Sequence, residues 1–244
     1  MTTQPSLHIK ANGPGVAKQF ADFLVDQLNQ RTGPFTLALS GGSTPKLLFK
    51  LLANDYREDI DWSRLVLFWG DERCVPHTDP DSNYGLTREL LLNSVPIPAE
   101  NIHPVNTALA PQAAAADYAQ LLEQYVVKGD NGLPVFDLIM LGMGDDGHTA
   151  SIFPHESEFL TSEQLTEVAT HPISGQKRVT FTGPVINNAW VVAFLVTGHG
   201  KTARVAQILN KEHHYQNFPA AHIAPQAGEL HWFMDEAAAL EVGY

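Results

Sequence analysis

The 244-residue sequence is poor in cysteine, in basic residues and in long hydrophobic stretches. Cys74 is the one cysteine, so no disulfide can form within the chain. This favours a reducing compartment and predicts a cytoplasmic location. The first 20 residues have neither a basic start nor a long apolar stretch, and we expect no signal peptide. No segment approaches the roughly 20 apolar residues that a membrane span needs.

The shortage of positive charge narrows the range of partners. The chain has 15 Lys and Arg against 27 Asp and Glu, a net charge of −12. Nucleic acids and anionic membranes bind to basic surfaces, so the composition argues against both. A small anionic substrate is compatible with it, because a few local cations decide such binding. The sequence does not define an oligomeric state, and a monomer is compatible with it.

Hydrophobic residues make up 44% of the chain, and short apolar runs alternate with helical windows. We predict strands at 35–40, 64–69, 136–141 and 189–196. We predict helices at about 15–30, 45–52, 82–92, 111–127 and 201–209, the third with Asp81 or Ser82 as N-cap. This alternation predicts an α/β fold with three α/β/α layers, a mainly parallel Rossmann-like sheet and one domain, 1–244. The segment at about 155–188 looks irregular and receives no predicted element.

Each predicted strand is followed by a loop rich in glycine or in charged residues. These loops are Gly41–Thr44, Gly70–Arg73, Gly142–Ser151 and Thr197–Lys201. In a parallel sheet the carboxyl ends of all strands lie at one edge, where ligands bind. We therefore expect four segments that are distant in the sequence to meet at one site.

The loop after the first predicted strand suits an anion. Gly41 and Gly42 let the backbone approach a ligand closely, and Ser43 and Thr44 add hydroxyl donors. We expect Thr44 to cap the next helix, with Pro45 at the first helical position and free N–H groups facing the anion. The spacing of a Walker A loop is absent. A tight turn with an ordinary N-cap is the structural alternative.

Four charged residues near the same edge are candidates for the site. Lys201 opens a predicted helix, where its charge opposes the helix dipole unless an anion is bound nearby. Arg178, in "KRVTFT", is a further candidate cation. Arg73 can donate to a phosphate or a developing oxyanion, and Asp71 can orient a hydroxyl or a cation. Each of them, taken alone, also fits a solvated side chain or a surface ion pair, and for Asp71, Arg73 and Arg178 that structural interpretation is the favoured one.

The loop "GMGDDGHTAS" (142–151) allows two interpretations. Its glycines fit G-x-G-x-x-G, but Asp145 and Asp146 would repel a pyrophosphate and Pro154 ends any helix early, which disfavours dinucleotide binding. A histidine is a suitable general base near neutral pH, and His148 has Asp146 two residues earlier to orient its other ring nitrogen. A capping histidine beside a turn-forming aspartate is the structural alternative.

Two other kinds of chemistry lack support in the sequence. His148 has no second histidine at H-x-x-x-H spacing, so we predict no metal. Ser43 is not part of a G-x-S-x-G elbow, so a serine nucleophile is not indicated.

Several motifs, in order, resemble the family of 6-phosphogluconolactonases and, more widely, the group that includes glucosamine-6-phosphate isomerase/deaminase. They are "LSGGSTP", "GDERCVP" with "DSNYGLTRELL", "FDLIMLGMGDDGHTASIFP", "RVTFT" and "FLVTGHGKT", within about 35–235. The deaminase branch typically has "DEY" and "GHIAFNEP", where this chain has "DER" and "GHTASIFP". The chain departs from the lactonase pattern at Asp145, at His199-Gly200 and in "HPISGQK", which lacks a Pro-rich lead-in.

The resemblance implies a three-layer α/β/α fold that hydrolyses 6-phospho-D-glucono-1,5-lactone to 6-phospho-D-gluconate in the pentose phosphate pathway, without cofactor or metal. Our hypothesis is that His148 activates water and Asp146 holds its ring, while Arg73 or a nearby backbone N–H stabilises the oxyanion and Asp71 orients the substrate or Arg73. The expected phosphate ligands are Gly41, Gly42, Ser43, Thr44, Arg178 and Lys201. The alternatives are a glucosamine-6-phosphate isomerase/deaminase with Asp146 as base, and a non-catalytic sugar-phosphate sensor.

Overall fold

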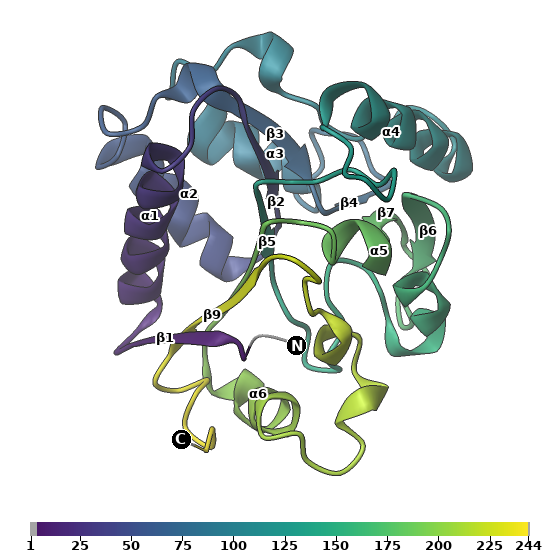
Figure 1. Cartoon of the computed structure of the whole chain (residues 1–244). Coiled ribbons are helices and arrows are strands. Elements are labelled where there is room, and N and C mark those ends of the chain that lie inside the picture. The colour runs from purple at the N-terminus through teal and green to yellow at the C-terminus, as the bar shows by residue number, and fades with distance from the viewer. Residues whose placement is uncertain (1–3, 244) are drawn as a thin grey trace.

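A computed structural model describes residues 4–243 of the chain and contains two sheets, the larger covered by helices on both faces (Figure 1). The larger sheet has six parallel strands in the order β1-β9-β8-β5-β2-β3. In this order the strands are Ser6–Lys10, Glu229–Asp235, Val191–Val196, Leu138–Leu141, Phe35–Leu39 and Leu65–Trp69. The predicted three-layer α/β/α class with a mainly parallel sheet is confirmed.

The four predicted strands correspond to β2, β3, β5 and β8, whereas β1 and β9 were not predicted. β1 is an edge strand that is only partly buried, so the continuous apolar run typical of a central parallel strand is missing. Polar residues interrupt both strands, with His8 in β1 and His231 in β9. A pattern search for buried strands therefore overlooks them.

The five predicted helices are found, whereas the short α5 was not predicted. Their bounds are α1 Gly13–Asn29, α2 Ser43–Asn54, α3 Asn83–Thr87, α4 Pro111–Tyr125, α5 Gly183–Ile186 and α6 Thr202–Leu209. The helical segment predicted at 82–92 is confirmed in extent, but it is α-helical only as far as Thr87 and continues as a π-helical turn at Arg88–Leu92. The predicted N-cap Ser82 is confirmed, since its side chain accepts from the backbone N–H of Gly85.

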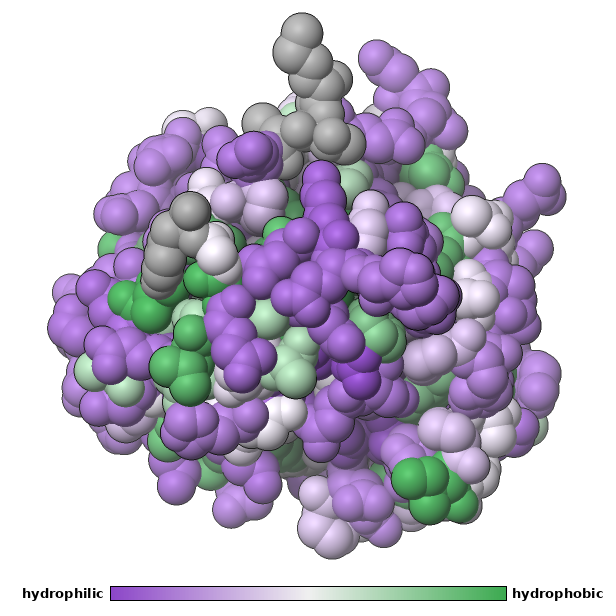
Figure 2. All heavy atoms as spheres, turned by 90° about the horizontal axis from the view of Figure 1, so that it is seen from below, coloured by the Kyte–Doolittle hydropathy of each residue, from purple (hydrophilic) through white to green (hydrophobic). Residues whose placement is uncertain are grey.

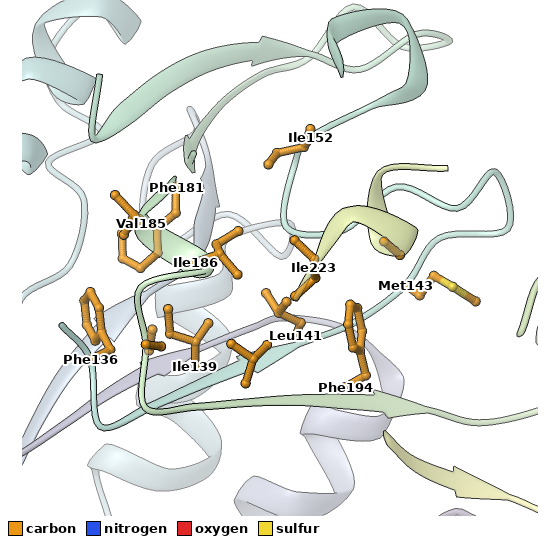
Figure 3. Packing of buried hydrophobic residues seen from close by; sticks show 14 of the residues in the cluster. Phe136, Ile139, Leu141, Met143, Ile152, Phe181, Val185, Ile186, Phe194 and Ile223 are labelled. Atoms are coloured by element: carbon orange, nitrogen blue, oxygen red, sulfur yellow. The ribbon is translucent and has the colours of Figure 1, made fainter. Parts of the chain in front are cut away.

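The larger sheet buries both of its faces. On one face α1 and α2 pack their apolar side chains, such as Phe20 and Phe49, against the strands. On the other face α4, α5 and α6 cover a second cluster, in which Leu141 of β5 and Phe194 of β8 lie near Ile223 (Figure 3). Each fully buried side chain of this size contributes roughly 1.5–3 kcal/mol through burial. Burial on both faces explains the unbroken apolar runs of the central strands.

A second, antiparallel sheet has the order β4-β7-β6, with bounds Asp71–Arg73, Lys177–Phe181 and Thr166–Thr170. The expectation of an irregular segment at 155–188 is therefore wrong, because it contains β6, β7 and α5. These elements are short and β6 is only partly buried, which weakens their apolar pattern. The chain passes from β3 through Gly70 directly into β4, so the loop expected at Gly70–Arg73 is itself a strand of the small sheet.

Hydrophilic side chains dominate the face seen from below, where hydrophobic atoms form only small separate patches (Figure 2). Within residues 4–243 no helix is both long enough and apolar enough to cross a membrane. The cytoplasmic location and the assignment of 1–244 to one domain stay predictions.

Candidate active site

The carboxyl edge of the large sheet holds a cavity of about 220 Å³. Its walls come from the four predicted loops and from β7 of the small sheet. All predicted site residues except Asp146 line it, namely Gly41, Gly42, Ser43, Thr44, Asp71, Arg73, His148, Arg178 and Lys201. Asp146 is hydrogen-bonded to the ring of His148. The structure thus brings together segments that are far apart in the sequence.

The loop after β5 is anchored in the core at both ends. Met143 and Ile152 belong to the cluster of buried side chains on one face of the sheet (Figure 3). Between them, the backbone N–H of Gly144 donates to the carbonyl of His148 at 2.9 Å, which closes a turn. The position of His148 is therefore set by a compact loop with two buried ends.

His148 and Asp146 form a hydrogen-bonded pair at this turn. The Nδ1 atom of His148 lies 2.6 Å from Oδ1 of Asp146, which also accepts the backbone N–H of His148 at 3.1 Å. Burial by itself raises the pKa of Asp146, but the hydrogen bonds and charge of His148 outweigh it and lower the pKa to about 2. An ionised Asp146 accepts, so Nδ1 donates and Nε2 of the neutral ring carries the free lone pair.

Gly144 makes room for this pair. A Cβ atom at this position would lie 2.2 Å from Nδ1 of His148 and 2.7 Å from Oδ1 of Asp146. The helix that a dinucleotide fingerprint needs after its third glycine does not form, because a 3₁₀ segment begins at Pro154. The glycine pattern serves the histidine–carboxylate pair, in agreement with the catalytic interpretation of the loop.

The loop after β2 places the first turn of α2 beside the cavity. The prediction of Thr44 as N-cap with Pro45 at the first helical position is wrong, because Gly42 is the N-cap and α2 begins at Ser43. The hydroxyl of Thr44 is instead 2.8 Å from that of Thr197, and so ties the loops after β2 and β8 together. The first N–H groups of a helix have no partner within it, which suits an anion.

Arg73 and Arg178 lie directly opposite each other in the β4–β7 ladder. Like charges at such a position repel. Burial lowers the pKa of Arg178, Arg73 lowers it further, and Asp71 opposes both effects. The Nε atom of Arg73 is buried and has no hydrogen-bond partner among the residues that the structure describes. Two paired cations with a free buried donor indicate a site for an anionic ligand.

Asp71 connects to Arg178 through a residue that sequence analysis missed. Oδ2 of Asp71 accepts from the hydroxyl of the buried Ser151 at 2.7 Å, and Nη1 of Arg178 lies 3.5 Å from that hydroxyl. The hypothesis gave Asp71 two possible roles, to orient the substrate or to orient Arg73, and no ion pair joins Asp71 to Arg73 within residues 4–243. Ser151 stands in a quoted motif, but nothing local in the sequence shows its partner.

Glu72 was also missed, although it lies inside the "GDER" motif. Its buried carboxylate accepts the backbone N–H groups of Arg73 at 2.7 Å, of Asn83 at 2.8 Å and of Tyr84 at 2.8 Å. Burial raises the pKa of Glu72, and these N–H groups oppose the rise. Glu72 thus fixes the start of α3 against β4, where the amide of Asn83 donates to the carbonyl of Asp71 at 2.9 Å.

Asn83 explains why position 41 is a glycine. A Cβ atom on Gly41 would lie 1.9 Å from Oδ1 of Asn83, which is itself buried. The backbone of the loop after β2 can therefore approach α3 only without a side chain at this position. A polar residue at the start of "NYGLT" was the available signal, but its contact with Gly41 depends on the fold.

Lys201 ends a 3₁₀ turn, His199–Lys201, immediately before α6. Its side chain lines the cavity, and its Nζ atom is paired with Oδ1 of Asp145. Among residues 4–243 no group of three or more His, Cys, Asp or Glu side chains is arranged to hold a metal ion. The absence of a metal and of a cofactor from the chemistry stays a prediction.

Fold and site together define a class: an α/β protein with a cavity lined by Arg73, Arg178 and Lys201 and a histidine–carboxylate pair, at the carboxyl edge of a parallel sheet. The family model described as "Glucosamine-6-phosphate isomerases/6-phosphogluconolactonase" matches residues 12–232. The chain belongs to this family.

Individual relatives agree with the family assignment. A 6-phosphogluconolactonase of Treponema pallidum is 45% identical over 200 residues, covering 81% of this chain and 83% of that protein. One of Haemophilus influenzae is 42% identical over 224 residues, covering 91% and 92%. A solved structure of 6-phosphogluconolactonase from Trypanosoma brucei matches with a TM-score of 0.88 and 29% identity, covering 98% of this chain and 99% of that one.

Proposed function

We propose that this chain hydrolyses 6-phospho-D-glucono-1,5-lactone to 6-phospho-D-gluconate, a step of the pentose phosphate pathway. One observation carries the proposal: a single cavity is lined by His148, which is held by a carboxylate, and by the first turn of α2 with Arg73, Arg178 and Lys201 around it. An ester carbonyl and a phosphate on the same small molecule need these two kinds of groups side by side. The relatives of the chain named as 6-phosphogluconolactonases support the same substrate.

The first step needs a base. Nε2 of His148 accepts a proton from a water molecule, whose oxygen attacks the lactone carbonyl carbon. Asp146 accepts the Nδ1 hydrogen at 2.6 Å, and so keeps the ring in the tautomer that has its lone pair on Nε2. The ionised Asp146 also stabilises the positive charge that the ring acquires.

The second step breaks the ring. The attack forms a tetrahedral intermediate whose oxyanion is stabilised by Arg73 or a nearby backbone N–H group. When the intermediate collapses, the bond between the carbonyl carbon and the ring oxygen breaks. The protonated His148 returns its proton to that oxygen, which becomes a hydroxyl. The carboxylic acid formed then loses its proton to solvent.

The phosphate end is held at the other wall of the cavity. The backbone N–H groups of Gly41 and Gly42 and the hydroxyls of Ser43 and Thr44 serve as neutral donors. Arg178 and Lys201 supply positive charge from β7 and from the turn before α6. Through Ser151, Asp71 positions Arg178, and this replaces the direct role toward Arg73 considered from the sequence.

The test is a coupled assay with freshly generated lactone, corrected for spontaneous hydrolysis. His148→Ala should lower kcat by about 10²–10⁴-fold, the usual contribution of a general acid–base group. His155→Ala is the matched control, because His155 stacks on the same Phe153 ring but does not line the cavity. Unchanged turnover in His148→Ala would show that His148 is not the general base.

Two further measurements separate the alternatives. Release of ammonia from glucosamine 6-phosphate by the wild-type protein would indicate the isomerase/deaminase reaction, for which Asp146 was the candidate base. Binding of 6-phosphogluconate without turnover of the lactone would indicate a sugar-phosphate sensor. Lactone hydrolysis without ammonia release is the expected result.

A further inference from the structure

The turn between β6 and β7 (171–176) lies in the segment that lacks the Pro-rich lead-in of the lactonase pattern. The backbone N–H of His171 donates to the carbonyl of Gln176 at 2.9 Å, which closes the turn. Gln176 immediately precedes β7 and stands two positions before Arg178, which lines the cavity. The turn therefore fixes the backbone of Gln176 close to a residue of the site, and the proposed mechanism gives the Gln176 side chain no role.

The amide of Gln176 joins Arg178 to the carboxylate of Asp81. Its oxygen accepts from Nε of Arg178 at 3.3 Å, and its nitrogen donates to Oδ2 of Asp81 at 3.0 Å. A guanidinium can only donate and a carboxylate accepts, so the two partners set the orientation of the amide. Asp81 and Gln176 are 95 positions apart in the sequence, and only the fold brings them together.

Arg178 is held from two sides. On its buried side, Nη1 lies 3.5 Å from the hydroxyl of Ser151, which donates to Asp71. On its other side, Nε donates to Gln176, which is only partly buried. Nη2 of Arg178 donates to no other group within residues 4–243, and so stays available to a ligand in the cavity. These two contacts fix the direction of the guanidinium plane.

Asp81 also holds the opposite guanidinium of the site. Nη1 of Arg73 donates to the backbone carbonyl of Asp81 at 2.5 Å. Arg73 faces Arg178 across the β4–β7 ladder, where the two positive charges repel. Burial lowers the pKa of Arg178 most, Arg73 lowers it further, and Asp81 is among the carboxylates that raise it. One acidic residue thus anchors both cations, Arg73 directly and Arg178 through Gln176.

A neutral amide suits a cation that binds a phosphate. A carboxylate at position 176 would pair directly with Arg178 and offset the charge that attracts the phosphate. An aliphatic side chain would leave this charge in place but would let the guanidinium turn. The amide of Gln176 orients Arg178 and preserves its charge.

We propose that Gln176 is a positioning residue, which through its bridge to Asp81 directs the guanidinium of Arg178 at the substrate phosphate. The proposal rests on the proposed function for the identity of the ligand, because Arg178 is one of the expected phosphate ligands. Gln176 does not line the cavity and acts only through Arg178. Loss of its amide should therefore weaken phosphate binding and leave the chemical step unchanged.

Two substitutions of Gln176 separate orientation from charge. Gln176→Ala removes the bridge, and KM for the lactone should rise about three- to tenfold, the value of one hydrogen bond. Its kcat and Tm should stay near those of the wild type. Gln176→Glu keeps an acceptor for Arg178 but adds a negative charge, so KM should also rise, and this rise should shrink as salt increases. A wild-type KM in either variant overturns the proposal.

Ser174→Ala is the matched control in the same turn. The Ser174 hydroxyl accepts the backbone N–H of Gln176 at 3.3 Å and lies 3.1 Å from Nδ1 of His171. Its removal disturbs the turn without touching Arg178, and KM should stay at the wild-type value. An equal rise of KM in Ser174→Ala and Gln176→Ala would mean that the shape of the turn matters and the amide does not, which also overturns the proposal.

Calorimetric titrations make the result independent of turnover. Affinities for inorganic phosphate and for 6-phosphogluconate should fall by the same factor in Gln176→Ala, because both probes carry the group that Arg178 binds. A loss confined to 6-phosphogluconate would contradict the proposal. An inactive wild type whose phosphate affinity still falls in Gln176→Ala would contradict only the proposed function. An active wild type with an unaffected Gln176→Ala would contradict only the role of Gln176.

Discussion

Nζ of Lys201 lies 2.5 Å from Oδ1 of Asp145, so a carboxylate of the His148 loop holds the candidate phosphate-binding cation. The two side chains differ in exposure, with 24% for Lys201 and 79% for Asp145. Arg204 of α6 donates from Nε to the backbone carbonyl of Asp145 at 3.0 Å, which holds the loop against this helix. The Asp145 carboxylate therefore competes with a substrate phosphate for the charge of Lys201.

Substitution Asp145→Asn should strengthen phosphate binding. The variant removes the competing charge but keeps the backbone carbonyl that Arg204 binds. We expect KM for the lactone to fall by up to about fivefold, because an exposed ion pair is worth about 0–1 kcal/mol. Steady-state kinetics at low and at high salt measure the change, and the difference from the wild type should shrink as salt rises.

Asp130→Asn is the matched control, since it removes the same charge from an exposed turn before β5, at the opposite edge of the sheet. An equal fall of KM in both variants would show a general effect of net charge instead. A higher KM in Asp145→Asn would mean that Asp145 positions Lys201 for the substrate and does not compete with it.

Gly144→Ala should damage the reaction while leaving phosphate binding intact. The new Cβ atom would meet Nδ1 of His148 at 2.2 Å and so push the ring away from Asp146. A displacement of about 1 Å in a catalytic group can cost about 10²-fold in rate. We expect kcat to fall by about this factor, with inhibition by inorganic phosphate unchanged.

Gly142→Ala serves as the control within the same loop, because a Cβ atom there would lie 3.8 Å from Oγ of Ser40, an ordinary contact. Its kcat should stay within a few-fold of the wild type. If Gly142→Ala and Gly144→Ala lose activity equally, flexibility of the loop matters more than the space beside His148.

The predictable part of the structure follows from two regularities. Central parallel strands are buried on both faces, so β2, β3, β5 and β8 are visible as apolar runs in the sequence. The carboxyl ends of such strands share an edge, so the residues that follow them meet there. These regularities place His148 and Lys201 at one cavity before any coordinates are known.

The remaining part depends on contacts that local patterns do not encode. Ser151 and Asp71 bond across a separation of 80 residues, and neither residue alone indicates the other. Thr44 has the sequence context of an N-cap, yet its hydroxyl lies next to that of Thr197. The two residues follow β2 and β8, which meet only because β5 lies between them in the sheet. Glu72 resembles a surface charge in the sequence, although it is fully buried among backbone N–H groups.

Ser151→Ala should reduce both stability and substrate affinity. The buried carboxylate of Asp71 would lose a donor at 2.7 Å, and Arg178 would lose its link to this carboxylate. A buried acceptor left without its donor costs about 1–3 kcal/mol. We expect the free energy of unfolding, measured with denaturant, to fall by about this amount and KM to rise.

Ser162→Ala is the comparison for the serine substitution. The Ser162 hydroxyl also donates to a carboxylate, that of Glu167 at 2.6 Å, but at a partly exposed position away from the cavity. It should change the free energy of unfolding by less than about 1 kcal/mol and leave KM unaltered. A wild-type KM in Ser151→Ala would show that the link from Asp71 through Ser151 to Arg178 is not needed for substrate binding.

A chain of hydrogen bonds joins the strands β1 and β9, remote from the cavity. The Glu229 carboxylate can only accept, so Nε2 of His231 donates to it at 2.9 Å. Nδ1 of His231 then accepts from Nε2 of His8 at 3.0 Å, and Nδ1 of His8 accepts from Gln19 of α1 at 3.4 Å. A further proton on either ring places two N–H groups face to face.

This chain should make the stability of the protein fall in mild acid. Burial lowers the pKa of His8, and the charges of His231 and Lys10 lower it further. The unfolded chain keeps the ordinary value of 6.5, so below this pH it binds a proton more readily than the folded chain does. The contribution to stability is complete above pH 6.5 and is lost as the pH falls.

Substitution His8→Gln tests this, because glutamine keeps a donor for His231 but does not titrate. We expect the free energy of unfolding of the wild type to fall more steeply between pH 7.5 and pH 5.5 than that of the variant. His213→Gln, an exposed histidine outside this chain of bonds, should keep the slope of the wild type. Parallel curves for the wild type and His8→Gln would mean that His8 keeps its ordinary pKa in the folded protein, and that the β1–β9 contact does not respond to protons.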